Sequence, residues 1–300
     1  MDGSTAMKMP EQAASSTWTI STVLKWAADD FRGRGIDQPR LDAEVLLAFA
    51  LRSTRVQLIV DAMRPLIPVE LARFRELVKR RRTREPVAYL VGEREFYGRT
   101  FRVDRRVLVP RPDTETLVEA ALRRTAPRAL GLRVVDLCTG SGCVGITLAR
   151  ELPTSKVLAT DIDEGALVVA RENALRLGAY NIGFSRADLY AGLPVYYGGV
   201  DLVVSNPPYI PTGDLAGLAA DIREYEPRVA LDGGPDGLGI VRRVIDEGRR
   251  LLRQGGVLAV EVGAGEAPLV RDEFTSRGFE RVEVLRDYGK VERVVHGIRC

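Results

Sequence analysis

The sequence predicts an α/β protein in which a largely parallel sheet with helices on both faces follows a small all-helical domain and a β-hairpin connector. From Arg133 onward, short apolar runs alternate with helical patterns, which is typical of such a sheet. Before that point, residues 20–85 have helical periodicity and residues 86–109 contain short β-like runs. We expect a disordered N-terminus at residues 1–19, a helical domain at 20–85, the connector at 86–109 and the α/β domain at 110–300.

The composition is that of an ordinary globular protein. Of the 300 residues, 45% are apolar and 28% are charged, which suits one large domain or two modest ones with a substantial core. No run approaches the length of a membrane span, and residues 1–17 lack the apolar centre of a secretion signal. We therefore expect a cytoplasmic protein.

The scarcity of cysteine and histidine narrows the possible chemistry. The three cysteines, Cys138, Cys143 and Cys300, are odd in number and too scattered for a disulfide framework or a zinc site. His296 is the single histidine in the sequence. We expect no metal site, and this composition argues against Ser-His-Asp catalysis.

The N-terminal part of the chain is basic. Residues 1–110 carry 20 Lys and Arg against 14 Asp and Glu, whereas the remainder carries 24 against 27. Helical patterns begin at Ser21, Leu41 and Val69, and the last of them ends in a basic run of Lys79, Arg80, Arg81, Arg82 and Arg84. These cations either complement the dipole of a helix C-terminus or form a surface that faces nucleic acid or the ribosome.

The connector is expected to contain short strands. Three β-like runs, Val87–Leu90, Glu95–Tyr97 and Thr100–Val103, surround a hairpin turn at Gly98. Pro112 then lies at or near a helix start and is followed by acidic residues, which are favourable in a first turn.

The first strand of the α/β domain ends in a glycine-rich turn. Val134–Leu137, which contains Asp136, leads through Cys138-Thr139-Gly140-Ser141-Gly142 into a helix. Glycines let a ligand approach the backbone, and a helix N-terminus favours a negative group such as a carboxylate. The next strand ends in Asp161, 25 residues after Asp136. Because an acid at this place commonly accepts hydrogen bonds from ribose hydroxyls, the pattern indicates a nucleoside ligand.

A nicotinamide dinucleotide is an alternative ligand for the same turn. Gly140, Gly142 and Gly145 match the spacing of the dinucleotide fingerprint. Asp136 inside the turn argues against it, as does the rigid segment that ends the fourth strand.

That rigid segment is Asn206-Pro207-Pro208-Tyr209, which follows the buried strand Asp201–Val204. Neither proline can donate to a sheet ladder, and each holds the residue before it in an extended conformation. The Asn206 carboxamide oxygen and the Pro207 carbonyl are two acceptors beside the ring of Tyr209. They suit a planar group that bears an NH2, such as a glutamine amide or an adenine amine, although Asn-Pro-Pro also occurs in ordinary loops.

Two further segments complete the predicted domain. Asp188 follows the third strand, Asn181–Ser185, and either holds an adenine amine or caps a turn. The segment Ile210–Gly237 is long and turn-rich, which is typical of a functional lid or a disordered loop. The remaining elements are a helix, a strand, a helix and two strands, at Leu238–Leu252, Gly256–Val262, Glu266–Arg277 and on either side of Asp287-Tyr288-Gly289-Lys290.

Together these motifs resemble the release factor glutamine methyltransferases. The resemblance extends from about Ser21 to Arg299 and rests on Pro110-Arg111-Pro112-Asp113-Thr114-Glu115, the turn from Asp136 to Gly142, Asn206-Pro207-Pro208-Tyr209-Ile210, Glu226-Pro227 with Ala230-Leu231, and Asp287-Tyr288-Gly289 with Glu292-Arg293. It implies a seven-stranded class I methyltransferase fold, Rossmann-like, that binds S-adenosylmethionine. Two residues depart from the pattern: Cys138, where many relatives have glycine, and Glu266, where many have glutamine.

The resemblance implies methyl transfer to the glutamine of the Gly-Gly-Gln loop in class I peptide release factors. We expect a monomer that needs neither membrane nor nucleic acid. The basic balance of the N-terminal part and its separate helical core further suggest that residues 20–84 dock the protein substrate. The catalytic residues would be Asn206, Pro207, Pro208 and Tyr209, which orient the amide nitrogen and pack on the amide plane. The cofactor would be held by Asp136, Cys138, Thr139, Gly140, Ser141 and Gly142 at the methionine end, Asp161 at the ribose, Asp188 and Leu189 at the adenine, and Arg111, Glu115 and Asn206 nearby.

Two other functions remain open. A methyltransferase for an adenine or guanine amine of DNA or RNA uses the same kind of turn, but it would need a basic face beside the crevice, and residues 111–300 are net negative. A non-catalytic cofactor-binding protein should have lost the tetrapeptide or Asp161, and both are present.

Overall fold

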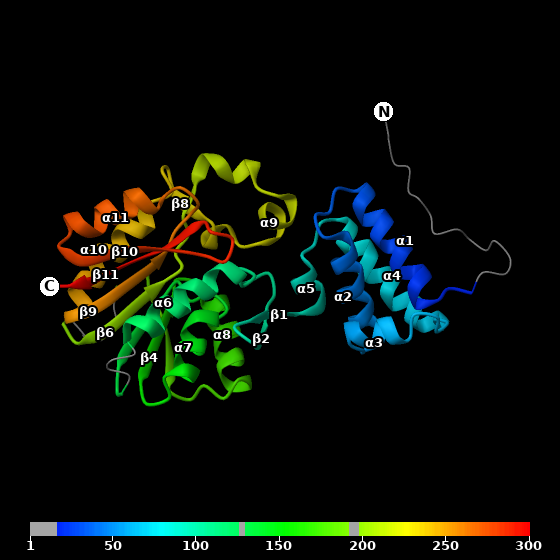
Figure 1. The fold of residues 1–300 in the computed structure, drawn as a ribbon, viewed down its shortest axis with the longest axis horizontal. Coiled ribbons are helices and arrows are strands. Elements are labelled where there is room, and N and C mark those ends of the chain that lie inside the picture. Colours follow the sequence, from blue (N-terminus) through cyan, green and yellow to red (C-terminus); the bar gives the residue numbers. More distant parts are fainter. Residues whose placement is uncertain (1–16, 126–129, 192–197) are drawn as a thin grey trace. The chain divides into compact units, whose positions relative to one another are not determined.

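The computed structural model describes residues 17–125, 130–191 and 198–300, which form two compact units, one up to Val91 and one from Gly92 to Cys300 (Figure 1). The N-terminal stretch expected to be disordered lies largely outside these residues. Within the described ranges, no helix combines the length and the apolar character needed to cross a membrane.

The first unit is built from short helices around one apolar centre. Its elements are α1 (Ile20–Gly33), α2 (Pro39–Leu51), α3 (Arg55–Val60), α4 (Pro68–Arg82) and α5 (Val87–Val91). Thr19 caps α1 by accepting a hydrogen bond from the backbone of Thr22, and prolines begin α2 and α4, where the missing N–H is not needed. Phe31, Leu46 and Phe74 are fully buried in the centre of the unit.

The basic run at the end of α4 is engaged within this unit. Three of its arginines pair with carboxylates: Arg80 with Glu85 at 2.6 Å, Arg81 with Asp42 at 2.8 Å and Arg82 with Asp30 at 2.8 Å. Arg84 donates to the carbonyl oxygen of Gly35 at 3.0 Å. These guanidinium groups therefore bind groups of the unit itself, which leaves them poorly suited to a phosphate backbone.

The strand expected at Val87–Leu90 is wrong, because this segment forms the helix α5. The Pro86 carbonyl accepts from the backbone N–H groups of Tyr89 and Leu90, at 3.0 and 3.1 Å, and Leu90 is buried in the helical core. Tertiary packing thus overrides the β-propensity of a short apolar run. The expected hairpin is present and opens the second unit as β1 (Glu93–Phe96) and β2 (Arg99–Arg102).

Over the described residues, the second unit contains a seven-stranded sheet in the order β10-β11-β9-β6-β3-β4-β5. β11 is antiparallel to both neighbours, whereas β9, β6, β3, β4 and β5 run parallel. The predicted seven-stranded, largely parallel sheet is thereby confirmed. The strands are β3 (Arg133–Leu137), β4 (Lys156–Asp161), β5 (Ile182–Arg186), β6 (Val200–Ser205), β9 (Leu252–Glu261), β10 (Phe279–Arg286) and β11 (Glu292–Arg299).

Helices cover both faces of this sheet (Figure 1). Because successive strand residues point to opposite faces, Val134 packs with α6 and α7, whereas Val135 packs with α10 and α11. These helices, with α8 on the first face, are α6 (Glu115–Thr125), α7 (Cys143–Glu151), α8 (Glu164–Arg176), α10 (Gly239–Leu251) and α11 (Ala267–Ser276). The central strands are therefore buried on both faces, and a binding site can form at their carboxyl ends.

The segment Ile210–Gly237, expected to lack regular structure, contains five short elements. They are β7 (Ile210–Pro211), the 3-10 helix η3 (Thr212–Gly217), α9 (Ala220–Tyr225), the 3-10 helix η4 (Arg228–Ala230) and β8 (Asp232–Gly234). β7 and β8 pair in parallel, and the Ile210 backbone N–H donates to the Leu231 carbonyl at 3.0 Å. The segment thus returns to the residue that follows the rigid tetrapeptide.

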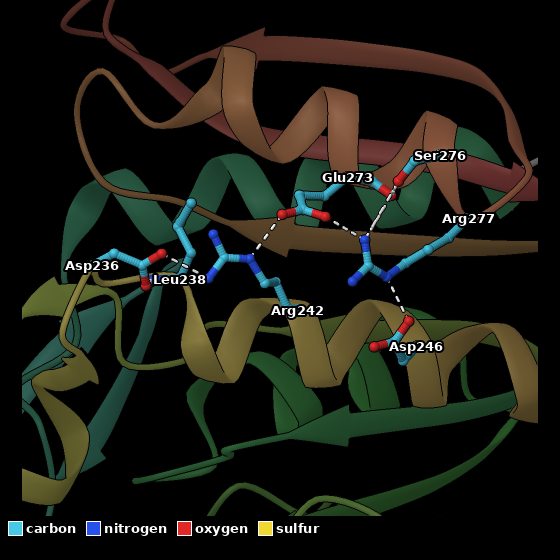
Figure 2. Close-up of polar contacts among 7 residues, drawn as sticks. All are labelled: Asp236, Leu238, Arg242, Asp246, Glu273, Ser276 and Arg277. Carbon is cyan, nitrogen blue, oxygen red and sulfur yellow. Dashed lines mark hydrogen bonds and ion pairs between the residues drawn. The ribbon is translucent and has the colours of Figure 1, made fainter.

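A chain of alternating charges joins α10, α11 and the loop after β8 (Figure 2). Arg242 bridges Asp236 and Glu273, with both N–O distances 2.7 Å. Arg277 continues the chain from Glu273 to Asp246, and its Nε lies 2.5 Å from an Asp246 oxygen. This network holds the loop at Asp236 against the two helices.

Candidate active site

The order of the sheet reverses between β3 and β6, which is where open parallel sheets bind ligands. A cavity of about 540 Å³ lies at the carboxyl ends of β3, β4 and β6. Eleven of the predicted site residues line it: Arg111, Asp136, Cys138, Thr139, Gly140, Ser141, Asp161, Asp188, Leu189, Asn206 and Pro208. Among the described residues, the other four, Glu115, Gly142, Pro207 and Tyr209, lie outside its lining.

Asp136 organises the glycine-rich turn. One carboxylate oxygen accepts from the Thr139 hydroxyl at 2.5 Å and from the Gly145 backbone N–H at 2.9 Å. A Cβ on Gly145 would lie 2.7 Å from that oxygen, so glycine is needed there for the contact with Asp136. Burial raises the pKa of Asp136 to about 7, which the two hydrogen bonds oppose. Gly145, the third glycine of the dinucleotide-like spacing, thus makes room for the Asp136 carboxylate.

Asp161, at the end of β4, is held by the backbone in a fixed orientation. Its two oxygens accept from the N–H groups of Gly140 and Asp163, at 2.9 and 3.0 Å. Burial raises its pKa, and these hydrogen bonds oppose the rise. Because each carboxylate oxygen can accept more than one hydrogen bond, acceptor capacity remains toward the cavity.

Two non-glycine residues of the lining have positive φ. Cys138 has φ 57° and Leu189 has φ 54°, in the left-handed region that favours glycine. Such strain concentrates at functional sites. The conformation of Cys138 also gives a physical reason why glycine would suit this position.

Asp188 lies at the cavity rim but already has a partner. Arg243 of α10 is 2.9 Å from one of its carboxylate oxygens, and both side chains are exposed. The other oxygen leaves capacity for an amine. Arg243 could not be predicted as a partner of Asp188, because the two residues lie 55 positions apart.

Asn206 follows β6, whose ladder with β3 and β9 ends at Ser205. The Asn206 side-chain NH2 donates to the Thr114 hydroxyl at 3.2 Å. The turn therefore has an anchored side chain in the lining, next to the acids of β3 and β4.

Tyr209 lies outside the cavity lining and packs against the loop that follows β8. A Cβ on Gly233 would overlap the Gly237 carbonyl oxygen and lie 2.8 Å from Tyr209 Cα. The Tyr209 ring contacts the sheet face that packs on α10 and α11, and burial raises the pKa of its hydroxyl. The charge network at Asp236 holds this same loop.

A second wall of the cavity is fastened by two arginines. Arg111 donates to the buried carboxylate of Glu226 at 2.7 Å, and Arg105 lies over the ring of Tyr225, 4.7 Å from its centroid. Both contacts hold the end of α9 against the segment before α6. Glu115 has a different role: it accepts from the Tyr97 backbone N–H at 2.8 Å and so ties α6 to the hairpin.

Three residues that line or fasten the cavity were not predicted from the sequence. Thr114, Glu226 and Arg243 line or fasten the cavity through partners distant in sequence. The available signal was weak: Thr114 and Glu226 lie in two of the family motifs, but nothing in the sequence indicated which side chains they meet.

Comparison with known proteins matches the chain to two family models. Residues 22–92 match the PrmC N-terminal domain, and residues 114–220 match the methyltransferase small domain. The release factor glutamine methyltransferase of Geobacter sulfurreducens is 44% identical over 283 residues, which cover 93% of this chain and 96% of the relative. That of Chlorobaculum tepidum is 42% identical, with 97% and 99% covered.

A solved structure shows the same fold in a more distant protein. The hMettl16 catalytic domain, in complex with the MAT2A 3'UTR hairpin 6, has a TM-score of 0.56 and 17% identity. The match covers 71% of this chain and 81% of that chain.

We predict that Gly233→Ala lowers the free energy of unfolding of the second unit by about 1–3 kcal/mol, because the added methyl overlaps the Gly237 carbonyl oxygen and crowds Tyr209 Cα. Gly213→Ala is the matched control, since a Cβ there would meet no described atom within 4 Å. Its effect should stay within about 1 kcal/mol. Urea unfolding measures both, and equal effects would contradict the close packing.

Proposed function

The chain belongs to the release factor glutamine methyltransferase family, and we propose that it transfers the methyl group of S-adenosylmethionine to the glutamine side-chain nitrogen in the Gly-Gly-Gln motif of class I peptide release factors. One observation carries the proposal. Asn206 and Pro208 of the rigid turn line the same cavity as Asp136 and Asp161, so an amide side chain lies beside the acids proposed to hold the cofactor.

The residues of the cavity fit the cofactor. Asp161 retains acceptor capacity for the ribose hydroxyls, and the start of α7, which no side chain of the described residues caps, favours a negatively charged group such as a carboxylate. The Asp161 carboxylate adds negative charge to this part of the lining, which favours a cationic ligand. Once bound, S-adenosylmethionine supplies a methyl group on a positively charged sulfur.

The protein's task is to prepare a poor nucleophile. The lone pair of an amide nitrogen is delocalised into its carbonyl group. If Asn206 Oδ1 and the Pro207 carbonyl accept the two N–H groups of the substrate amide, they orient the nitrogen and favour positive charge as it develops. After methylation the nitrogen is strongly acidic, so the proton can leave to solvent. Tyr209 supports this turn through its packing against the sheet.

The helical unit is proposed to dock the protein substrate. Val56, Ile59, Val60 and Met63 follow helical spacing along α3 and its end, and their exposed fractions are 70–78%. A stripe of apolar side chains at this exposure is typical of a protein-binding surface. We expect the contacts of this stripe to contribute to binding the substrate and not to the methyl transfer.

We expect the protein to label a purified release factor when it is incubated with radiolabelled S-adenosylmethionine, and to leave DNA and ribosomal RNA unlabelled. In single-turnover assays with saturating cofactor, Asn206→Ala should lower the rate about 10²–10³-fold, because one preorganised acceptor is lost. Its affinity for S-adenosylhomocysteine should change far less. Label on nucleic acid instead would support the amine methyltransferase, and a wild-type rate for Asn206→Ala would refute the proposed role of the turn.

For the helical unit, we predict that Ile59→Ser raises KM for intact release factor about 3- to 10-fold, since an exposed apolar contact is lost. Turnover of a short Gly-Gly-Gln peptide should not change. Leu175→Ser is the matched control, because Leu175 is equally exposed, at 71%, on α8 of the second unit. An equal loss on the peptide and the intact factor would exclude docking through α3.

A further inference from the structure

A buried glutamate lies directly beside Asn206. Glu261 ends β9, the strand next to β6, and the pairing of Ser205 with Val260 places the two residues at the same level of adjacent strands. Glu261 is 1% exposed. Burial raises its pKa to about 7, while hydrogen bonds from Thr114 and Asn206 and the charge of Arg293 act in the opposite direction.

The groups around Glu261 come from three separate segments of the chain. Thr114 belongs to the 3-10 helix η1 (Pro112–Thr114) and is 2% exposed. Its hydroxyl accepts a hydrogen bond from the Asn206 NH2 at 3.2 Å. Arg293, on β11, is engaged by Asp287 at 3.2 Å and by Asp113 at 3.4 Å. Since Arg293 has these two acidic partners, its charge is largely balanced without Glu261.

The chemistry of these partners fixes which end of the Asn206 amide faces them. A carboxyl group keeps at least one accepting oxygen in either protonation state. The Asn206 NH2 donates to the Thr114 hydroxyl at 3.2 Å, and strand pairing puts the Glu261 carboxyl, which can also accept, next to the same residue. Thr114 thus binds the NH2 end of Asn206, and Glu261 lies beside it as a second group able to accept, so Oδ1 is left as the end available to the cavity.

Burial of Glu261 lowers the stability of the fold, which argues against a purely structural role. Within the described residues, its Oε2 is buried and has no hydrogen-bond partner. An unsatisfied buried oxygen costs stability, and an apolar side chain would fill the same space more favourably. A local choice that opposes stability is typical of a functional site.

We propose that Glu261 is a positioning residue that, with Thr114, holds the Asn206 carboxamide so that Oδ1 accepts from the substrate amide. This inference rests on the proposed function and adds a residue outside the cavity lining to it. Glu261 acts through Asn206 and does not itself contact the substrate.

The test is a double-mutant cycle in single-turnover methyl transfer to a release factor. Glu261→Ala should lower the rate about 10- to 100-fold, because the buried Asn206 NH2 loses a neighbouring acceptor, with KM changed less than about 3-fold. In the Asn206→Ala background, the same change should have almost no further effect. Independent, multiplying effects would overturn the proposal. S-adenosylhomocysteine binding by calorimetry shows whether each variant is folded.

Two isosteric variants keep the proposal testable if Glu261→Ala does not fold. Glu261→Gln retains an acceptor oxygen and should lose less activity than the alanine variant. Thr114→Val removes the other acceptor and should lower the rate about 10-fold. Thr125→Val is its control, because this buried hydroxyl bonds only carbonyls of its own helix among the described groups. A wild-type rate for Thr114→Val, or equal losses for both Glu261 variants, would overturn the proposal.

The outcomes also separate this inference from the proposed function. If the wild-type protein labels no release factor, the proposed function fails. If the wild type is active and Glu261→Ala is equally active, only the positioning role fails.

Discussion

The arrangement of the site depends on the forced end of one central strand. β6 pairs with β3 and β9 up to Ser205, and the two prolines that follow cannot donate to either ladder. The chain must therefore leave the sheet at its carboxyl edge, at the point where the strand order reverses. Asn206 is thereby brought to the edge where the acids of β3 and β4 also end. A turn that could continue the ladder would carry Asn206 along the sheet, away from them.

Around this edge, buried polar groups are held by the backbone and by one another. Asp136 and Asp161 each accept two hydrogen bonds near the glycine-rich turn, which partly offset the effect of their burial and set their orientation before any ligand arrives. On the opposite side, the Arg111 to Glu226 contact fastens the wall formed after α9. The site is thus preorganised by contacts between strand ends and short connecting segments.

The general fold followed from the sequence because it depends on local periodicity. Alternating apolar strands and helices predicted the sheet, and the stiff tetrapeptide predicted the end of β6. The α5 helix was missed because Val87–Leu90 owes its conformation to tertiary packing. The partners of Asn206 could not be predicted either: Thr114 lies 92 positions away, and Glu261 meets Asn206 only through strand pairing. The motifs identified most of the residues that line the cavity, whereas contacts between distant residues determine how each side chain is oriented.

A crystal structure of the protein with S-adenosylhomocysteine and a Gly-Gly-Gln peptide tests the central claim most directly. We expect the glutamine side-chain nitrogen to lie about 2.7–3.2 Å from both Asn206 Oδ1 and the Pro207 carbonyl oxygen, with Asn206 still donating to Thr114. A glutamine amide bound away from these two oxygens, or an Asn206 side chain that presents its NH2 to the substrate, would contradict the claim.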